Sequence, residues 1–360
     1  MRRVPRAGLW VLLALVLAAG AYVSYVLLSY YRVEDNLPLE VLKAAEPEQE
    51  TLAVETPCRA VSYNIGFGAY SADYSFFMDG GQESRARSAE AVYENVGGAM
   101  AAARDLSPDF LLLQEVDVDG TRSHHVDELE MVRTALGAGY DSTFAQNYDS
   151  PFLFWPLLEP HGANQAGQVT FSRYPIVSAL RRQLPVEEGA MKLVDCDRCY
   201  SVQRISVPGE AGELVLYNLH LSAYTSDGTI AEEQLRLLFS DMAGEYQKGN
   251  WAVAGGDFNK DLLGDSDQIF GVSGPAYTWA QPIPAQLVPE GLTVVAPFNQ
   301  GDPAASCRNA DRPYGPESYL VTVDGFVVSG NVTVLDSGVS DTGFLWSDHN
   351  PVYLDFVLNK

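Results

Sequence analysis

Polar side chains suited to metal binding and acid–base chemistry recur in this sequence at the ends of short apolar runs. The candidates are Asn64, Glu115, His220, Asp257, Asn259, Asp348 and His349. Strand ends are where sheet-based folds usually display a site. Carboxylates, amides and two imidazoles make an oxygen-rich set that suits Mg²⁺ or Mn²⁺ better than zinc. The set predicts a Mg²⁺-dependent centre, with Mn²⁺ as the alternative ion.

Each of these residues also has an ordinary structural interpretation when it is taken alone. An asparagine after a strand is commonly a turn residue or a helix cap, and the Gly-Asp-Phe-Asn segment at 256–259 has the composition of a turn. A glutamate that closes an apolar strand is commonly just solvated. The functional interpretation therefore depends on the joint arrangement and not on any single position.

The segments that must position these residues alternate between β-rich runs and helical stretches. We expect strands at 59–64, 110–114, 169–172, 203–207, 214–218, 251–255, 322–328 and 352–356, and helices at 84–106, 126–136 and 229–246. Residues 265–309 have a loop-rich composition. Mixed strands and helices without a strict alternation predict two packed sheets with helices outside, within one domain at 58–360.

The N-terminus carries an apolar run from Gly8 to Leu28 that follows three arginines and contains neither charge nor proline. At about 1.5 Å per residue this run matches a hydrocarbon core of about 30 Å. We therefore predict a transmembrane anchor at 1–32 with the later residues outside the cytoplasm. The alternative is a signal peptide cleaved near Ala19-Gly20-Ala21, which would leave a secreted body. Residues 33–57 are acidic and contain three prolines, which predicts a linker.

The chain is strongly acidic, with 47 acidic and 23 basic residues and a formal net charge of −24. Such a field repels polyanions, which argues against a nucleic-acid binder that depends on general charge attraction. It leaves local phosphate chemistry open, because a bound divalent cation reverses the local potential.

Taken in order, the motifs resemble the endonuclease/exonuclease/phosphatase superfamily, which includes DNase I-like nucleases, inositol polyphosphate 5-phosphatases and neutral sphingomyelinases. The resemblance extends from about Cys58 to the C-terminus. The matching segments are 62–65 (SYNI), 113–116 (LQEV), 167–175, 218–221 (NLHL), 256–259 (GDFN), 323–326 (VDGF) and 347–351 (SDHNP). It implies a four-layer α/β sandwich of two packed mixed β-sheets flanked by helices.

The resemblance also implies which residues hold the metal. Glu115 resembles the principal metal ligand, with Asn64 beside it and Asp348 completing or bridging the site.

The same resemblance assigns the catalytic roles. His349 is similar to the histidine that acts as general base on water or binds the scissile phosphate, and Asp324 to the carboxylate that pairs with it. Asp257 resembles the aspartate that orients the attacking water, and Asn259 the amide that stabilises charge on phosphorus. His220 matches a histidine that contacts the phosphate and can protonate the leaving group.

Substrate choice depends on loops around this constellation. Arg122 is a candidate for binding a second substrate phosphate, with a purely structural role as the alternative. We expect a hydrolase of phosphate mono- or diesters at the cell surface, acting on a small molecule or a lipid headgroup, with no protein partner implied. A DNase I-like nuclease acting on nucleic acid and a non-catalytic surface binding module are the alternatives.

Overall fold

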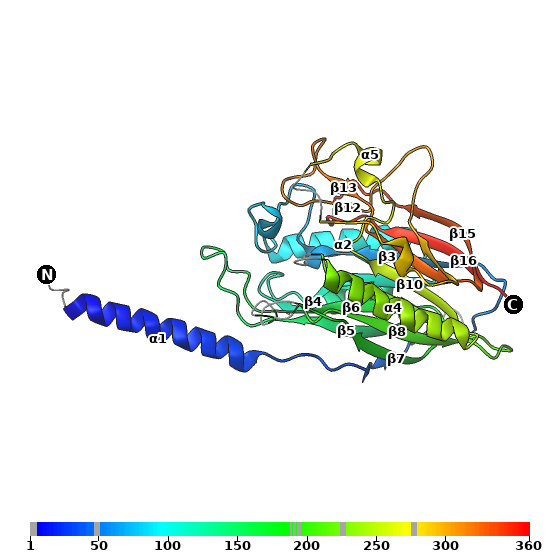
Figure 1. Cartoon of the computed structure of the whole chain (residues 1–360), viewed down its shortest axis with the longest axis horizontal. Helices are drawn as coiled ribbons and strands as arrows, with labels where there is room; N and C mark the ends of the chain where they lie inside the picture. The colour runs from blue at the N-terminus through cyan, green and yellow to red at the C-terminus, as the bar shows by residue number, and fades with distance from the viewer. Residues whose placement is uncertain are drawn as a thin grey trace.

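The computed structural model of the chain describes residues 6–46, 51–187, 189, 192, 196–223, 228–274 and 279–360. Two seven-stranded sheets pack face to face (Figure 1). From edge to edge the first contains β1 (Leu37–Pro38), β7 (Ile176–Gln183), β8 (Cys199–Ser206), β9 (Glu213–His220), β10 (Trp251–Asp257), β14 (Asp324–Ser329) and β11 (Leu292–Val295). The second contains β15 (Val332–Val339), β16 (Val352–Leu358), β3 (Cys58–Asn64), β4 (Phe110–Gly120), β6 (Asn164–Ser172), β5 (Asp141–Asp149) and β2 (Val41–Leu42).

Helices cover the outer face of each sheet. The second sheet carries α2 (Ala89–Asp105) and α3 (Glu128–Leu136), and the first carries α4 (Thr229–Gln247). The order helix, sheet, sheet, helix confirms the predicted four-layer α/β sandwich. Two smaller features lie among the loops: α5 (Ser266–Phe270) and the strand pair β12 (Cys307–Arg308) with β13 (Leu320–Val321).

Central strands are buried on both faces, which explains their nearly continuous apolar runs. In β4, Leu111 and Leu113 face the helices, whereas Phe110 and Leu112 face the opposite sheet. Successive side chains of a strand point to opposite faces, so a strand between two cores needs apolar residues at every position. Polar residues within such runs therefore require partners, and this requirement bears on the site described below.

The helix starts follow from capping side chains. The Ser88 hydroxyl accepts a hydrogen bond from the Ala91 amide and starts α2, later than the expected residue 84. The Asp127 carboxylate does the same for α3 through the Glu130 amide. Both side chains satisfy amide groups that have no partner within the helix.

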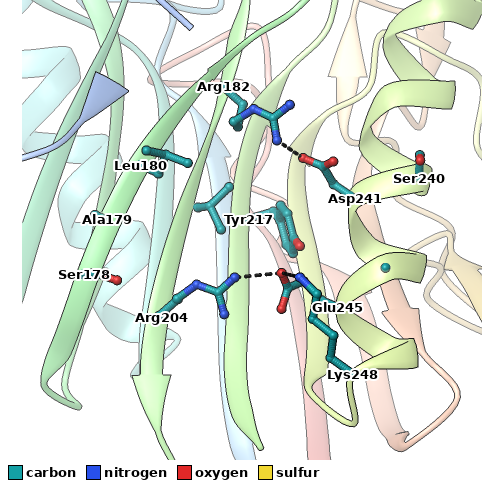
Figure 2. A pocket seen from close by; sticks show the side chains of 12 residues that line it. Ser178, Ala179, Leu180, Arg182, Arg204, Tyr217, Ser240, Asp241, Glu245 and Lys248 are labelled. Carbon is teal, nitrogen blue, oxygen red and sulfur yellow. Dashed lines mark hydrogen bonds and ion pairs between the residues drawn. The ribbon is translucent and has the colours of Figure 1, made fainter. Parts of the chain in front are cut away.

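Ion pairs join α4 to its sheet at a cavity of about 240 Å³ (Figure 2). Arg182 of β7 pairs with Asp241, and Arg204 of β8 pairs with Glu245 at 2.7 Å. Burial acts to raise the pKa of Glu245, but hydrogen bonds led by that from Arg204 lower it to about 2. Because these charges already pair within the protein, we interpret this cavity as structural.

The N-terminal helix α1 (Arg6–Ser29) projects from the sandwich (Figure 1). Among the described residues it is the single helix long and apolar enough to cross a membrane, from Ala7 to Ser29, and a signal sequence has the same properties.

The first half of the segment predicted as a linker contains two short strands that pair with the sheets, and its role as a linker stays a prediction. Strand β1 pairs with β7 and β2 pairs with β5, so each short strand forms one edge of its sheet. The buried Arg181 guanidinium also donates to the carbonyls of Val33 and Glu34. Exposed edges offer unpaired backbone groups, and this segment satisfies them on both sheets.

Candidate active site

Strand register brings the predicted residues together at one end of the two sheets. Parallel pairing of β9 with β10 places His220 beside Asp257, and antiparallel pairing of β10 with β14 places Asp324 on the other side of Asp257. In the second sheet, β3 pairs in parallel with β4 and aligns Asn64 with Gln114. The residues at the ends of these apolar strands therefore lie close together.

A β-bulge directs Glu115 into the site. The register of β4 against β6 breaks between Leu113 and Val116, and Glu115 has a left-handed φ of 54°. A bulge of this kind bends its strand and redirects a side chain. The Asn64 amide then donates to the Glu115 carboxylate and to the Asp257 carboxylate, both at 3.2 Å, and so connects the two sheets.

Unusual backbone conformations concentrate around the same residues. Gly256 has a φ of 152°, and a Cβ there would lie 2.0 Å from the carbonyl oxygen of Leu219. Only glycine therefore allows β9 and β10 to approach so closely beside Asp257. Asn259 has a φ of 49°, and its amide nitrogen donates to Asp257 Oδ1 at 2.8 Å. Each left-handed non-glycine residue costs about 1–3 kcal/mol, and such residues cluster at functional sites.

His349 and Asp324 form a buried pair. His349 Nδ1 lies 2.7 Å from Asp324 Oδ2, which leaves Nε2 facing Asp257 at 3.8 Å. Burial lowers the pKa of His349, but the Asp324 charge outweighs it and the pKa rises well above its usual value. The pair thus has the geometry and the basicity of an oriented imidazole.

His220 has the opposite electrostatic environment. Burial, followed by the positive charges of Arg198 and His349, holds the pKa of His220 well below its usual value. Its Nε2 lies 3.4 Å from Asp257 Oδ2 and 4.0 Å from Glu115 Oε1. Burial raises the pKa of Asp257 to about 7, against the opposing effect of His349. The site therefore contains one imidazole that favours the charged form and one that favours the neutral form.

Oxygen ligands for a cation gather beside this pair. Burial raises the pKa of Asp348 to about 6; the positive charges of His349 and Arg308 oppose this, and the negative charge of Glu115 adds to it. Carboxylates that repel one another at short range favour a divalent cation between them. The Glu115 and Asp348 carboxylates are oxygen donors, which fits Mg²⁺ or Mn²⁺. The Asn64 side-chain oxygen accepts from the Gly66 amide at 3.0 Å while its nitrogen faces Glu115, so a role of Asn64 as a ligand stays a prediction.

A second set of potential ligands consists of Asp257, Asp324 and His349, whose ligand atoms lie within 4.8 Å of one another. Its shortest contact is the hydrogen bond between Asp324 and His349. That bond occupies Nδ1 of the imidazole, so the set is better suited to acid–base chemistry than to enclosing an ion.

The site opens into a cavity of about 550 Å³ with an aromatic wall. The wall includes Phe67, Tyr70, Phe76, Phe77, Leu153, Trp155 and Trp279, and the polar floor includes Glu115, His220, Asp257, Asn259, Asp348 and His349. A pocket of this size accommodates a small molecule or a lipid headgroup.

Arg122 also lines this cavity, but its charge is already paired. Its guanidinium is buried, lies 2.6 Å from Asp117 Oδ1 and stacks over the Phe67 ring at 4.0 Å. This environment agrees with the structural alternative, because a phosphate would have to compete with Asp117. A role in binding a second phosphate stays a prediction.

Sequence reasoning missed a polar connection beneath the site. Gln114 Nε2 donates to Asn218 Oδ1 at 2.8 Å, and Asn218 Nδ2 donates to the carbonyls of Leu113 and Val169. Gln114 and Asn218 are fully buried and come from different sheets. The available signal was an amide side chain inside each apolar strand, at positions that face the opposite sheet.

Comparisons with known proteins agree with this arrangement. The model of the endonuclease/exonuclease/phosphatase family matches residues 61–349. An endonuclease/exonuclease/phosphatase from Beutenbergia cavernae is 22% identical with a TM-score of 0.57, covering 84% of this chain and 72% of its own. ANGEL2, a 2′,3′-cyclic phosphatase, is 16% identical with a TM-score of 0.52, covering 89% and 98%. A mannosyl-6-phosphatase from Bacteroides thetaiotaomicron is 17% identical with a TM-score of 0.50, covering 84% and 100%.

Among curated proteins no match to this chain is found. The identities of the solved structures are low, so these structures support the fold alone. The family model covers most of the chain, and its limits enclose every predicted site residue from Asn64 to His349. The chain therefore belongs to the endonuclease/exonuclease/phosphatase family.

Proposed function

We propose that this protein is a membrane-anchored, extracytoplasmic, Mg²⁺-dependent hydrolase of phosphate mono- or diesters. The observation that carries the proposal is the convergence of the Asp324–His349 pair, His220 and the Glu115–Asp348 oxygen ligands on one cavity. Phosphate ester hydrolysis mainly requires positioning of water and neutralisation of charge on phosphorus, and these groups provide both.

The proposed roles follow from the electrostatics of each group. His349, oriented by Asp324, takes the proton of the attacking water at Nε2 when the imidazole is neutral, and its raised pKa shifts this activity toward higher pH. Asp257 orients that water through a carboxylate that also contacts Asn64. His220, which favours the neutral form, fits a hydrogen-bond donor to the phosphate better than an acid for the leaving group.

Glu115, Asn64 and Asp348 would hold the divalent cation, which would polarise a phosphate oxygen. Asn259 donates its backbone amide to Asp257 Oδ1 at 2.8 Å, and its side-chain amide donates to the Leu221 carbonyl at 2.9 Å. In the bound complex we expect its second N–H to stabilise charge on a phosphate oxygen.

The relatives support phosphate esters as the substrate class without identifying one. A 2′,3′-cyclic phosphatase and a mannosyl-6-phosphatase share the fold. A nuclease of the DNase I type remains the alternative function, since it would use the same catalytic groups. The net charge of −24 favours a small ester or a headgroup over a polyanion.

The test is hydrolysis by the full-length protein in detergent, with a generic phosphodiester, a phosphomonoester, sphingomyelin and plasmid DNA as substrates. Each assay is run with Mg²⁺, with chelator and with the His349→Ala variant. His125→Ala is the matched control, because His125 is an exposed histidine paired with exposed Asp119. Turnover that depends on Mg²⁺ and His349 establishes the enzyme. Equal turnover by His349→Ala refutes the assignment of the base, and no turnover of any substrate favours a binding module.

A further inference from the structure

The loop between β5 and β6 exposes a group of large apolar side chains. Residues 150–158 contain no charge, and Leu158, Leu157, Trp155 and Phe154 are 100%, 73%, 65% and 52% exposed. Single exposed apolar residues are ordinary, but a contiguous group of this kind marks a contact surface. We call residues 152–158 the apolar loop.

The apolar loop contacts the N-terminal helix at two tyrosines. The Tyr22 hydroxyl donates to the Phe152 carbonyl, and the Phe152 amide donates to the Tyr25 hydroxyl, both at 3.0 Å. The Tyr22 and Phe154 rings meet edge to face with centroids 5.0 Å apart. In Figure 1 the loop between β5 and β6 extends from the sheets on the same side as α1.

These contacts set the depth of the loop along the helix. Tyr22 precedes the last helical residue, Ser29, by seven positions, so the contact lies about 10 Å along the helix axis from its end. Tyrosines commonly occupy the level of the headgroups in membrane proteins, and amphipathic elements insert about 5–10 Å below the surface. The apolar loop therefore lies at the depth of the outer-leaflet interface if α1 crosses the membrane.

The same loop forms part of the active-site cavity. Leu153 and Trp155 line the cavity, and Leu153 pairs with Gly162 through two backbone hydrogen bonds of 3.0 Å. At the end of this loop, His161 Nδ1 lies 2.6 Å from the Ser84 carbonyl oxygen. The base of the loop is thus fixed to the cavity wall, while Leu157 and Leu158 at its tip are exposed.

We propose that the apolar loop is a second membrane contact, inserted into the outer leaflet beside α1, and that it places the cavity against the lipid headgroups. Lipid is the partner that we favour for the apolar loop, because the loop continues the apolar surface of α1. The side chains of α1 are almost all exposed in the protein. The substrate class is then a phosphate ester of a lipid headgroup, and this part of the inference rests on the proposed function. Strong negative charge of the body favours zwitterionic over anionic headgroups.

Insertion is tested with the full-length protein in phosphatidylcholine vesicles. A Leu158→Cys variant and a Leu335→Cys control carry an environment-sensitive fluorophore. Leu335 is 53% exposed on β15, which lies away from α1 in Figure 1. Labelling of the unsubstituted protein measures the contribution of native thiols. We expect nitroxide-labelled lipids to quench the probe at 158 and aqueous iodide to quench the probe at 335. Equal iodide quenching at both positions, without lipid quenching at 158, would overturn the proposal.

The substrate class is tested separately with Leu157→Glu/Leu158→Glu and the control Leu335→Glu. We expect the double variant to lose roughly tenfold or more of its activity on a vesicle-borne phospholipid, while turnover of a soluble phosphodiester changes less than about twofold. Unchanged activity of the double variant on vesicles refutes the role of the loop in placing the cavity against the headgroups, even where the probe lies in lipid. Hydrolysis of the soluble phosphodiester but not of the phospholipid by the unsubstituted protein refutes the headgroup substrate. If neither substrate is hydrolysed by the unsubstituted protein, the proposed function fails, and the quenching result still decides whether the loop inserts.

Discussion

Replacing Asp324 with asparagine tests whether the buried pair orients and activates His349. Asp324 is fully buried, and its Oδ2 lies 2.7 Å from His349 Nδ1. The substitution preserves shape but removes the charge. If the new amide donates to Nδ1, the imidazole carries its proton on Nε2 and can no longer accept one from water.

The expected loss in kcat is about 10²–10⁴-fold, the contribution of a positioned base. That range corresponds to about 3–5 kcal/mol of transition-state stabilisation. Because the substrate contacts are unchanged, KM should change only a few-fold. The raised pKa of His349 depends on Asp324, so its removal lowers that pKa. A base must be neutral, so activity rises with pH through this pKa, and the rise should move to lower pH in the variant.

The assay is steady-state hydrolysis of a soluble phosphodiester over a range of pH, with thermal unfolding as a check of folding. Asp119→Asn is the matched control, because Asp119 contacts His125 in an exposed pair outside the site. A kcat close to that of the unsubstituted protein would refute the orienting role. Activity that falls as pH rises through the pKa of His349 would refute the base and favour a phosphate-binding imidazolium.

Three further perturbations test the surrounding structure. Gly256→Ala should lower the free energy of unfolding by about 2–4 kcal/mol in denaturant titrations, because its Cβ would meet the Leu219 carbonyl at 2.0 Å; an unchanged midpoint would contradict this close approach. Glu245→Gln should weaken the contact with Arg204 and reduce stability at neutral pH by about 1–3 kcal/mol. The pKa of Glu245 is about 2, below its usual 4.5, so its contribution is present above pH 4.5 and is lost as pH falls toward 2; the variant should lack this loss, as measured by thermal unfolding against pH. Glu115→Gln should raise the Mg²⁺ concentration needed for half-maximal activity by more than roughly tenfold, measured after chelation and titration; an unchanged requirement would remove Glu115 from the metal site.

Much of the fold and the position of the candidate site could be predicted from local sequence pattern. Strands such as β4 are apolar runs in the sequence because both of their faces are buried. Ser88 and Asp127 cap helices α2 and α3, which they directly precede in the sequence. The candidate site was predictable because Asn64 and Asp257 end apolar strands, and strand ends gather at one edge of a sheet.

The side-chain contacts in and beneath the candidate site join distant parts of the chain. Gln114 pairs with Asn218 across the two sheets, and Arg122 turns inward to Asp117, a partner that its sequence context did not identify. Local pattern does not specify such partners, because a polar side chain has many competing partners until the sheets are packed.

The sequence by itself therefore indicated the family, the two-sheet class of the fold and the candidate site residues. Only the tertiary structure decided that the bulge at Glu115 directs its carboxylate to the cavity, that β1 and β2 join the sheet edges, and that Phe152 meets Tyr22. The physical reason is that strand pairing, burial and charge pairing depend on neighbours in space. Those same neighbours raise the pKa of His349 and lower the pKa of His220, although the sequence shows each only as a histidine next to an apolar strand.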